Sequence, residues 1–195
     1  YLTGVGETIH IADFHCNDSM DIFDNKTVWN IDDGDAGESS FDNDEAANNN
    51  FHCNSVAGIA LGDDETDVLF RGVAPDANVV LSSIPDFEGT FRGDDRAADL
   101  DFARSKGAIA SNNSWGVDRI ASDFQTLYDN NKNSFTMDQL VGYYLEGNIN
   151  VPSGQTAATQ EYITALDNFQ NSGVIVFANG NDSSKGDASF IASLP

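Results

Sequence analysis

The chain has 195 residues, of which 40% are hydrophobic, so it is long enough for one substantial core and too short for two ordinary domains. Its 32 acidic and 9 basic residues give a formal net charge of −23, which repels nucleic acids and anionic membrane surfaces. The sequence holds no apolar run of the ~18 residues that a membrane-spanning helix needs. We therefore expect one domain over residues 1–195, with neither a nucleic acid nor a membrane as its partner.

Predicted strands and helices alternate along the chain. Strands are predicted at residues 8–13, 78–84, 108–115 and 174–178, and helices at residues 55–61, 94–106 and 156–172. Gly107 and Gly173 follow the last two helices and suit their ends. Such alternation implies right-handed crossovers, so we expect an α/β fold: a three-layer, mostly parallel sheet with helices on both faces. Sheets of this kind bind ligands at the carboxyl ends of their strands.

Two stretches interrupt the alternation. Residues 17–50 are dominated by Asp, Asn and Ser, which predicts an acidic surface excursion rather than part of the core. Residues 117–155 form a longer insertion whose large side chains predict packed helical structure: Phe124, Leu127, Tyr128, Leu140, Tyr143 and Tyr144. Neither stretch shows a change of composition sharp enough to mark a domain boundary.

Three polar residues follow or precede predicted elements at places suited to catalysis. Asp13 ends the first strand, where rigid backbone would hold a carboxylate able to orient an imidazole. His52 precedes a helix of small residues, a place that suits a general base. Asn181 follows the strand at 174–178 in a turn flanked by Gly180, where its amide could donate to a developing oxyanion. Taken singly, each residue is more simply interpreted as a turn, surface or packing residue.

Taken together, these residues resemble the catalytic segments of the subtilases, serine proteases whose triad follows the order Asp, His, Ser. The resemblance rests on five segments in the family's order: Gly-Glu-Thr-Ile-His-Ile-Ala-Asp (6–13), His-Cys-Asn-Ser-Val-Ala-Gly (52–58), Arg-Gly-Val-Ala-Pro-Asp-Ala (71–77), Ser-Asn-Asn-Ser-Trp-Gly (111–116) and Ser-Gly-Val-Ile-Val-Phe-Ala-Asn-Gly-Asn (172–181). It implies a subtilisin-like fold and a secreted serine endopeptidase that acts on polypeptides.

The resemblance also implies a role for each site residue. Asp13 would orient His52, His52 would act as the general base, and the side-chain amide of Asn181 would donate to the oxygen of the tetrahedral intermediate. A substrate peptide would bind in extended form between two backbone edges, formed by Ser114, Trp115 and Gly116 on one side and by Ala178, Asn179 and Gly180 on the other. Trp115 would line a pocket or, alternatively, cap the core.

The chain also departs from the family pattern. Phe14-His15 and Cys53-Asn54 replace the small residues that usually follow the catalytic Asp and His, and the nucleophile segment G-T-S-x-A is absent. Because that segment follows the oxyanion Asn in this family, our hypothesis places the serine beyond Pro195. The remainder of the catalytic domain, in the same or a cleaved chain, would then be a partner. The alternative is an inactive subtilase-like module that acts as a binding or structural part of an extracellular assembly.

The two cysteines lie close to the predicted catalytic pair. Because Asp13 and His52 would be neighbours in the fold, Cys16 and Cys53 would be near each other, and a disulfide is the simplest consequence. Closing a loop of this length would stabilise the fold by about 4 kcal/mol on a chain-entropy estimate. Zinc held by the two His-Cys pairs and free thiols are the alternatives that stay open.

Composition bears on location and cofactors as well. A highly charged surface stays soluble in a salty medium, so we expect an extracellular or cell-surface protein, with an ordinary acidic surface as the alternative. The implied reaction requires no cofactor and no metal at the site. The acidic loops could hold a structural calcium ion, as in many subtilases, although no segment keeps an EF-hand spacing.

Overall fold

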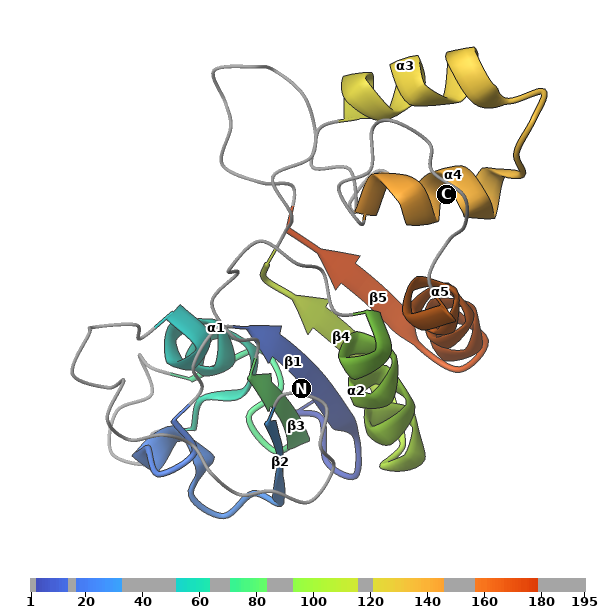
Figure 1. Cartoon of the computed structure of the whole chain (residues 1–195). Helices are drawn as coiled ribbons and strands as arrows, with labels where there is room; N and C mark the ends of the chain where they lie inside the picture. Colours follow the sequence, from blue (N-terminus) through green and yellow to red (C-terminus); the bar gives the residue numbers. More distant parts are fainter. Residues whose placement is uncertain are drawn as a thin grey trace.

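The fold was examined in a computed structural model, which describes residues 3–13, 17–32, 52–63, 71–83, 93–115, 121–145 and 157–178. Five parallel strands form one sheet in the order β2-β3-β1-β4-β5 (Figure 1). The strands are β1 (Thr8–Asp13), β2 (Val28–Asp32), β3 (Asn78–Ser83), β4 (Ala108–Asn113) and β5 (Val174–Phe177). The helices are the short 3-10 helix η1 (Asp21–Phe23), α1 (His52–Leu61), α2 (Gly93–Ser105), α3 (Ala121–Asn131), α4 (Met137–Leu145) and α5 (Ala157–Gln170).

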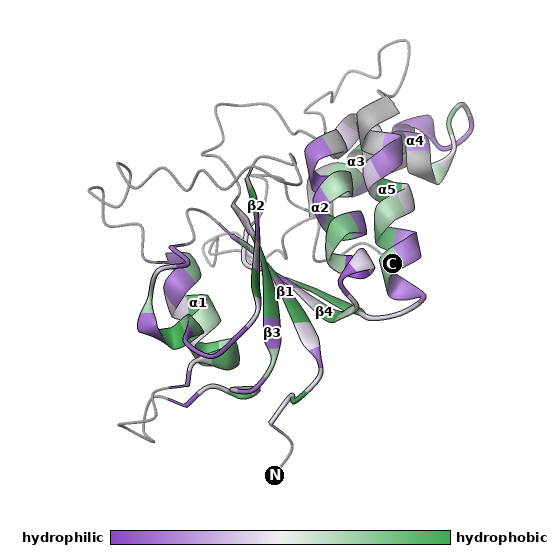
Figure 2. Cartoon of the chain, turned by 90° about the horizontal axis from the view of Figure 1, so that it is seen from below, coloured by the Kyte–Doolittle hydropathy of each residue, from purple (hydrophilic) through white to green (hydrophobic). Residues whose placement is uncertain are grey.

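Helices cover both faces of the sheet, and Figure 2 shows the apolar strands lying between them. On one face α1 packs on β1 and β3 through a cluster that includes Ile11, Ala57 and Leu81. On the other face α2 and α5 lie side by side, and their cluster includes Leu100 and Phe169. Successive residues of a strand point to opposite faces, and β1, β2 and β3 each supply both clusters. The predicted three-layer parallel fold is confirmed.

Residues 28–32 correct the sequence analysis, which assigned them to a surface excursion. They form β2, which pairs in parallel with β3. Ile31 is fully buried in the core. Phe23, at the end of η1, is also buried. The segment Val-Trp-Asn-Ile-Asp is short, and acidic residues and Asn surround it. The composition of residues 17–50 as a whole therefore did not indicate a strand there. Residues 33–50 lie outside the described residues.

The insertion at 117–155 contains packed helices in its described part, as predicted. α3 and α4 contribute Leu127, Leu140 and Tyr144 to the same cluster as α2 and α5. The rings of Phe124 and Tyr144 meet edge to face, with their centroids 5.6 Å apart. A capping box begins α4: the Gln139 N–H donates to Thr136 Oγ1, and the Thr136 N–H donates to Gln139 Oε1.

The turn at 71–77 joins α1 to β3 and fixes the C-terminal end of the helix. Its N–H groups donate to the last carbonyls of the α1 segment: Gly72 to Gly62, Val73 to Ile59 and Ala74 to Ala60, all within 3.1 Å. A Cβ on Gly72 would lie 2.6 Å from the backbone nitrogens of Leu61 and Gly62, closer than atoms can approach, so glycine is needed there. α1 is thereby held against the sheet from both its face and its end.

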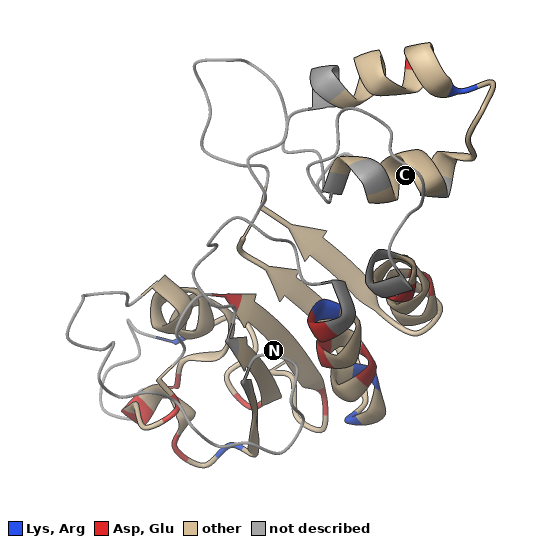
Figure 3. Ribbon diagram, in the orientation of Figure 1, with Lys and Arg blue, Asp and Glu red and all other residues tan. Residues whose placement is uncertain are grey.

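Most charged side chains of the described residues are exposed or partly exposed. Acidic residues predominate around η1 and along α2 (Figure 3). An exception is the buried ion pair of Arg96 and Asp99 in α2, whose Nη1 and Oδ2 atoms are 3.1 Å apart. In the described part of the chain, none of the helices combines the length and the apolar character that crossing a membrane requires.

Candidate active site

Asp13 occupies the carboxyl end of the central strand. β1 pairs with β3 on one side and with β4 on the other, so the backbone that carries Asp13 is held on both sides. The Asp13 side chain is fully buried. The carboxylate is therefore fixed in position and shielded from water at the edge of the sheet where ligands bind.

His52 begins α1 and faces Asp13. Its Nδ1 atom lies 2.8 Å from Oδ1 and 2.9 Å from Oδ2 of Asp13. A carboxylate can only accept, so Nδ1 carries the hydrogen and donates it, which leaves a lone pair on Nε2. The His52 side chain is 58% exposed, and Nε2 makes no hydrogen bond to any described residue. The pair thus places a shielded carboxylate behind an accessible ring nitrogen, and Asp13 and His52 are neighbours, as the sequence predicted.

The side chain of Asn54 ties the start of α1 to the segment that follows β1. Its Nδ2 donates to the carbonyl of Asn17 at 2.7 Å, and its Oδ1 accepts from the Asn17 N–H at 3.1 Å. This reciprocal pair of bonds joins the two segments that carry Asp13 and His52. In the sequence, Asn54 stands out only as a departure from the family pattern. The signal was present, however, because a polar residue inside a helix needs a partner if it is buried.

Cys53 is fully buried beside His52 and is disulfide-bonded. Cys16 lies outside the described residues, so its pairing with Cys53 stays a prediction. The contact between Asn17 and Asn54 is consistent with it, because these residues directly follow the two cysteines. Among the described residues, no group of three or more His, Cys, Asp or Glu side chains is arranged to hold a metal ion.

The predicted substrate edges meet at the ends of β4 and β5. The Ser114 N–H donates to the carbonyl of Ala12 at 3.2 Å, one residue before Asp13. The Ala178 N–H donates to the carbonyl of Asn113 at 2.9 Å. The first residues of the two edges therefore lie beside each other and beside the strand that carries Asp13.

Trp115 caps the core, the second of the two roles predicted for it. Its side chain is 3% exposed, belongs to the cluster formed by α2 and α5, and meets the ring of Phe177 edge to face at 6.0 Å. Its backbone still follows β4 as the predicted substrate edge requires. Gly116, Asn179, Gly180 and Asn181 fall in parts of the chain that the structure does not describe, so their predicted roles stay predictions.

A second histidine, His10, lies on the opposite face of β1 from Asp13. It is 1% exposed and bonds to Ser82 and Ser111, each at 2.8 Å. Burial, with a smaller contribution from the positive charge of Arg96, lowers the pKa of His10 from 6.5 to about 3. His10 is therefore neutral at neutral pH.

Comparisons with known proteins agree with this fold. A family model of the subtilase family matches residues 4–193. Similar solved structures are the prenylagaramide maturation protease PagA (17% identity, TM-score 0.57, covering 97% of this chain and 51% of that one) and the self-cleaved protease domain of PatA (19%, 0.58, 100% and 57%). Another is the nisin leader peptidase NisP from Lactococcus lactis (16%, 0.53, 94% and 46%). The chain thus spans about half the length of these structures. No curated protein matches it at a significant level.

Proposed function

Because the chain belongs to the subtilase family, we propose that it supplies the acid and the base of a subtilisin-type serine endopeptidase. Asp13 is the orienting acid, His52 is the general base, and the serine nucleophile follows residue 195 in the complete protein. One observation carries this proposal: the buried carboxylate of Asp13 accepts a hydrogen bond from Nδ1 of the accessible His52.

The proposed reaction is acyl transfer. The serine oxygen attacks the carbonyl carbon of the substrate while Nε2 of His52 takes the hydroxyl proton, and the imidazolium then gives that proton to the leaving amine. Water then attacks the acyl-enzyme in the same way, with His52 again acting as the general base. Asp13 stays ionised and stabilises the imidazolium, an interaction that burial strengthens. Asn181 would donate its amide hydrogen to the tetrahedral oxyanion.

We propose a polypeptide as the substrate. An extended chain would pair with the backbone of Ser114–Gly116 on one side and of Ala178–Gly180 on the other. The hydrogen bonds of Ser114 and Ala178 to neighbouring strands support this, since they hold the start of each edge in line with the sheet. Two of the similar structures, PagA and NisP, are a maturation protease and a leader peptidase, which supports the same class of substrate.

The remainder of the catalytic domain is the partner that we propose for the uncovered part of the sheet. Ile175 and Phe177 of β5 pack on the α5 side, so Val174 and Val176 point to the face that carries α1. These two valines are 62% and 51% exposed, and apolar surface on a sheet face is normally covered. A further segment packed there would lie beside α1 and could bring the serine hydroxyl to His52.

We further propose that the protein works outside the cell or at its surface. Its acidic composition and the disulfide at Cys53 support this location. The proposed chemistry uses no cofactor. A structural calcium ion in the acidic loops stays a prediction, since residues 33–50 are not among those that the structure describes.

A serine-directed fluorophosphonate tests the proposal. The complete protein, including the residues beyond 195, should form a covalent adduct on one serine and should cleave peptides, because His52 would raise the nucleophilicity of that serine. Intact mass before and after reaction gives the stoichiometry, and protein unfolded in denaturant is the control. Folded complete protein that stays unlabelled would instead favour the alternative, an inactive subtilase-like binding module.

A further inference from the structure

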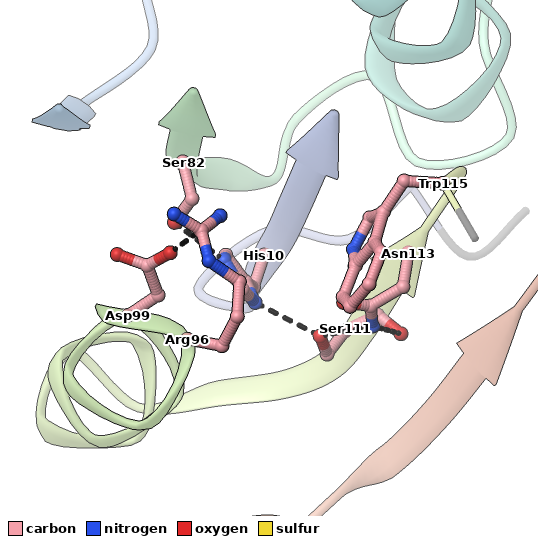
Figure 4. A network of polar contacts seen from close by, with 7 residues as sticks. All are labelled: His10, Ser82, Arg96, Asp99, Ser111, Asn113 and Trp115. Carbon is pink, nitrogen blue, oxygen red and sulfur yellow. Dashed lines mark hydrogen bonds and ion pairs between the residues drawn. The ribbon is translucent and has the colours of Figure 1, made fainter. Parts of the chain in front are cut away.

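A series of buried polar side chains crosses the sheet on its α2 side (Figure 4). His10 of the central strand bonds through Nε2 to Ser82 Oγ of β3 and through Nδ1 to Ser111 Oγ of β4. Asn113, two residues further along β4, donates from Nδ2 to Ser111 Oγ at 2.9 Å. The Trp115 Nε1–H then donates to Asn113 Oδ1 at 3.1 Å.

The chemistry of these groups fixes the direction of the bonds. An indole N–H can only donate, so the oxygen of the Asn113 amide must face Trp115. The nitrogen of that amide must then face Ser111, to which it donates. His10 is neutral, so one of its ring nitrogens donates to a serine oxygen and the other accepts from a serine hydroxyl.

All five side chains are buried, which makes the arrangement rigid. The series is formed by Ser82, His10, Ser111, Asn113 and Trp115, and none of them is more than 3% exposed. A polar group that loses its partner in such a place is left without a hydrogen bond to water, so alternative rotamers are costly. The series therefore holds its last member, Trp115, in one orientation.

That last member is itself part of the candidate substrate edge. Asn113 and Trp115 lie on either side of Ser114, whose N–H donates to the carbonyl of Ala12. The carbonyl of Asn113 accepts from the N–H of Ala178, the first residue of the facing edge. The first residue of each proposed edge therefore adjoins Asn113, a member of the series: Ser114 follows it in the chain, and Ala178 bonds to its carbonyl.

We propose that the buried series from His10 to Trp115 orders the backbone of Ser114 and Trp115 for pairing with an extended polypeptide. Asn113 and Trp115 are positioning residues, since they act through the backbone beside them and not on the reacting atoms. The identity of the ligand rests on the proposed function, whereas the ordering of this edge can be measured without it.

The variant Trp115→Phe tests the ordering, because it keeps an aromatic ring in the core and removes the indole donor together with part of the ring volume. The matched control is Trp29→Phe, which makes the same change at the half-buried tryptophan of β2, on the far side of β3 from β4. Hydrogen exchange of the Ser114 and Ala178 amides should become about tenfold faster in Trp115→Phe, as expected for the loss of one buried hydrogen bond. In Trp29→Phe both rates should stay within twofold of the wild type. Unchanged exchange in Trp115→Phe, or equal acceleration in both variants, overturns the proposal.

Kinetics of the complete protein give the second readout. Trp115→Phe should raise KM for peptide substrates several-fold and leave kcat within about twofold, because Asp13 and His52 are untouched. A lower kcat at unchanged KM contradicts a positioning role at the substrate edge. If none of the proteins, wild type included, reacts with a fluorophosphonate, the proposed function has failed, and amide exchange alone decides whether the series orders this edge.

Discussion

Replacing Asp13 by Asn should lower kcat of the complete protein by about 10⁴-fold with little change in KM. An asparagine amide presents a donor as well as an acceptor, so it no longer holds the hydrogen of His52 on Nδ1. The ring then adopts the tautomer with hydrogen on Nε2, which cannot accept the proton of the serine. Initial rates on a peptide substrate, at a neutral pH where both proteins are folded, measure the effect.

Two further variants sharpen this result. His52→Ala should lower kcat by about 10⁶-fold. The double variant Asp13→Asn/His52→Ala should have the same kcat as His52→Ala alone, because the two residues act as one unit. Asp24→Asn is the matched control, since it removes one negative charge from an exposed position after η1. Equal losses from Asp13→Asn and Asp24→Asn would show that net charge, and not orientation of His52, underlies the effect.

The free energy of unfolding should fall as the pH drops below 6.5, in part because of His10. Burial first, and the charge of Arg96 second, lower the pKa of the native His10 to about 3, whereas the unfolded residue titrates near 6.5. Between these pH values the unfolded chain binds a proton that the native protein does not. The contribution of His10 is therefore complete above pH 6.5 and declines on acidification, by up to 1.36 kcal/mol per pH unit.

Urea unfolding of wild type and His10→Asn at pH 7.5 and 4.5 isolates this contribution. The variant is expected to be less stable at pH 7.5, because it does not reproduce both bonds to Ser82 and Ser111. Its loss of stability between the two pH values should nevertheless be smaller than that of the wild type, by roughly 3 kcal/mol. Identical losses in the two proteins would mean that His10 binds its proton as readily in the native state as in the unfolded one.

Much of the fold could be predicted from the sequence because the core strands are short apolar runs between clear helix signals. Thr8–Asp13 was predicted with its observed bounds, and the helix near 94–106 differs by one residue at each end. β2 was missed because acidic and Asn-rich neighbours dominate its surroundings and its own apolar residues are few. Pairing with β3 supplies the stabilisation that local sequence does not show.

The contact between Asp13 and His52 could be predicted, although 38 residues separate them, because the order of family segments implies the juxtaposition. The contacts around it could not. The bonds of Asn54 to Asn17 and of His10 to two serines depend on which side chains the packed sheet brings together. No local pattern records such contacts, since their partners lie on separate strands or loops.

The central claim is that Asp13 holds His52 in the tautomer that leaves Nε2 free to act as a base. Nitrogen-15 NMR of the imidazole rings measures this directly on the chain itself, and the spectrum of His52→Ala identifies the signals of His52 among the three histidines. At a pH where the ring is neutral, the account predicts hydrogen on Nδ1 of His52 in the wild type, and its transfer to Nε2 in Asp13→Asn. Hydrogen on Nε2 in the wild type, or a tautomer that does not respond to Asp13→Asn, would contradict it.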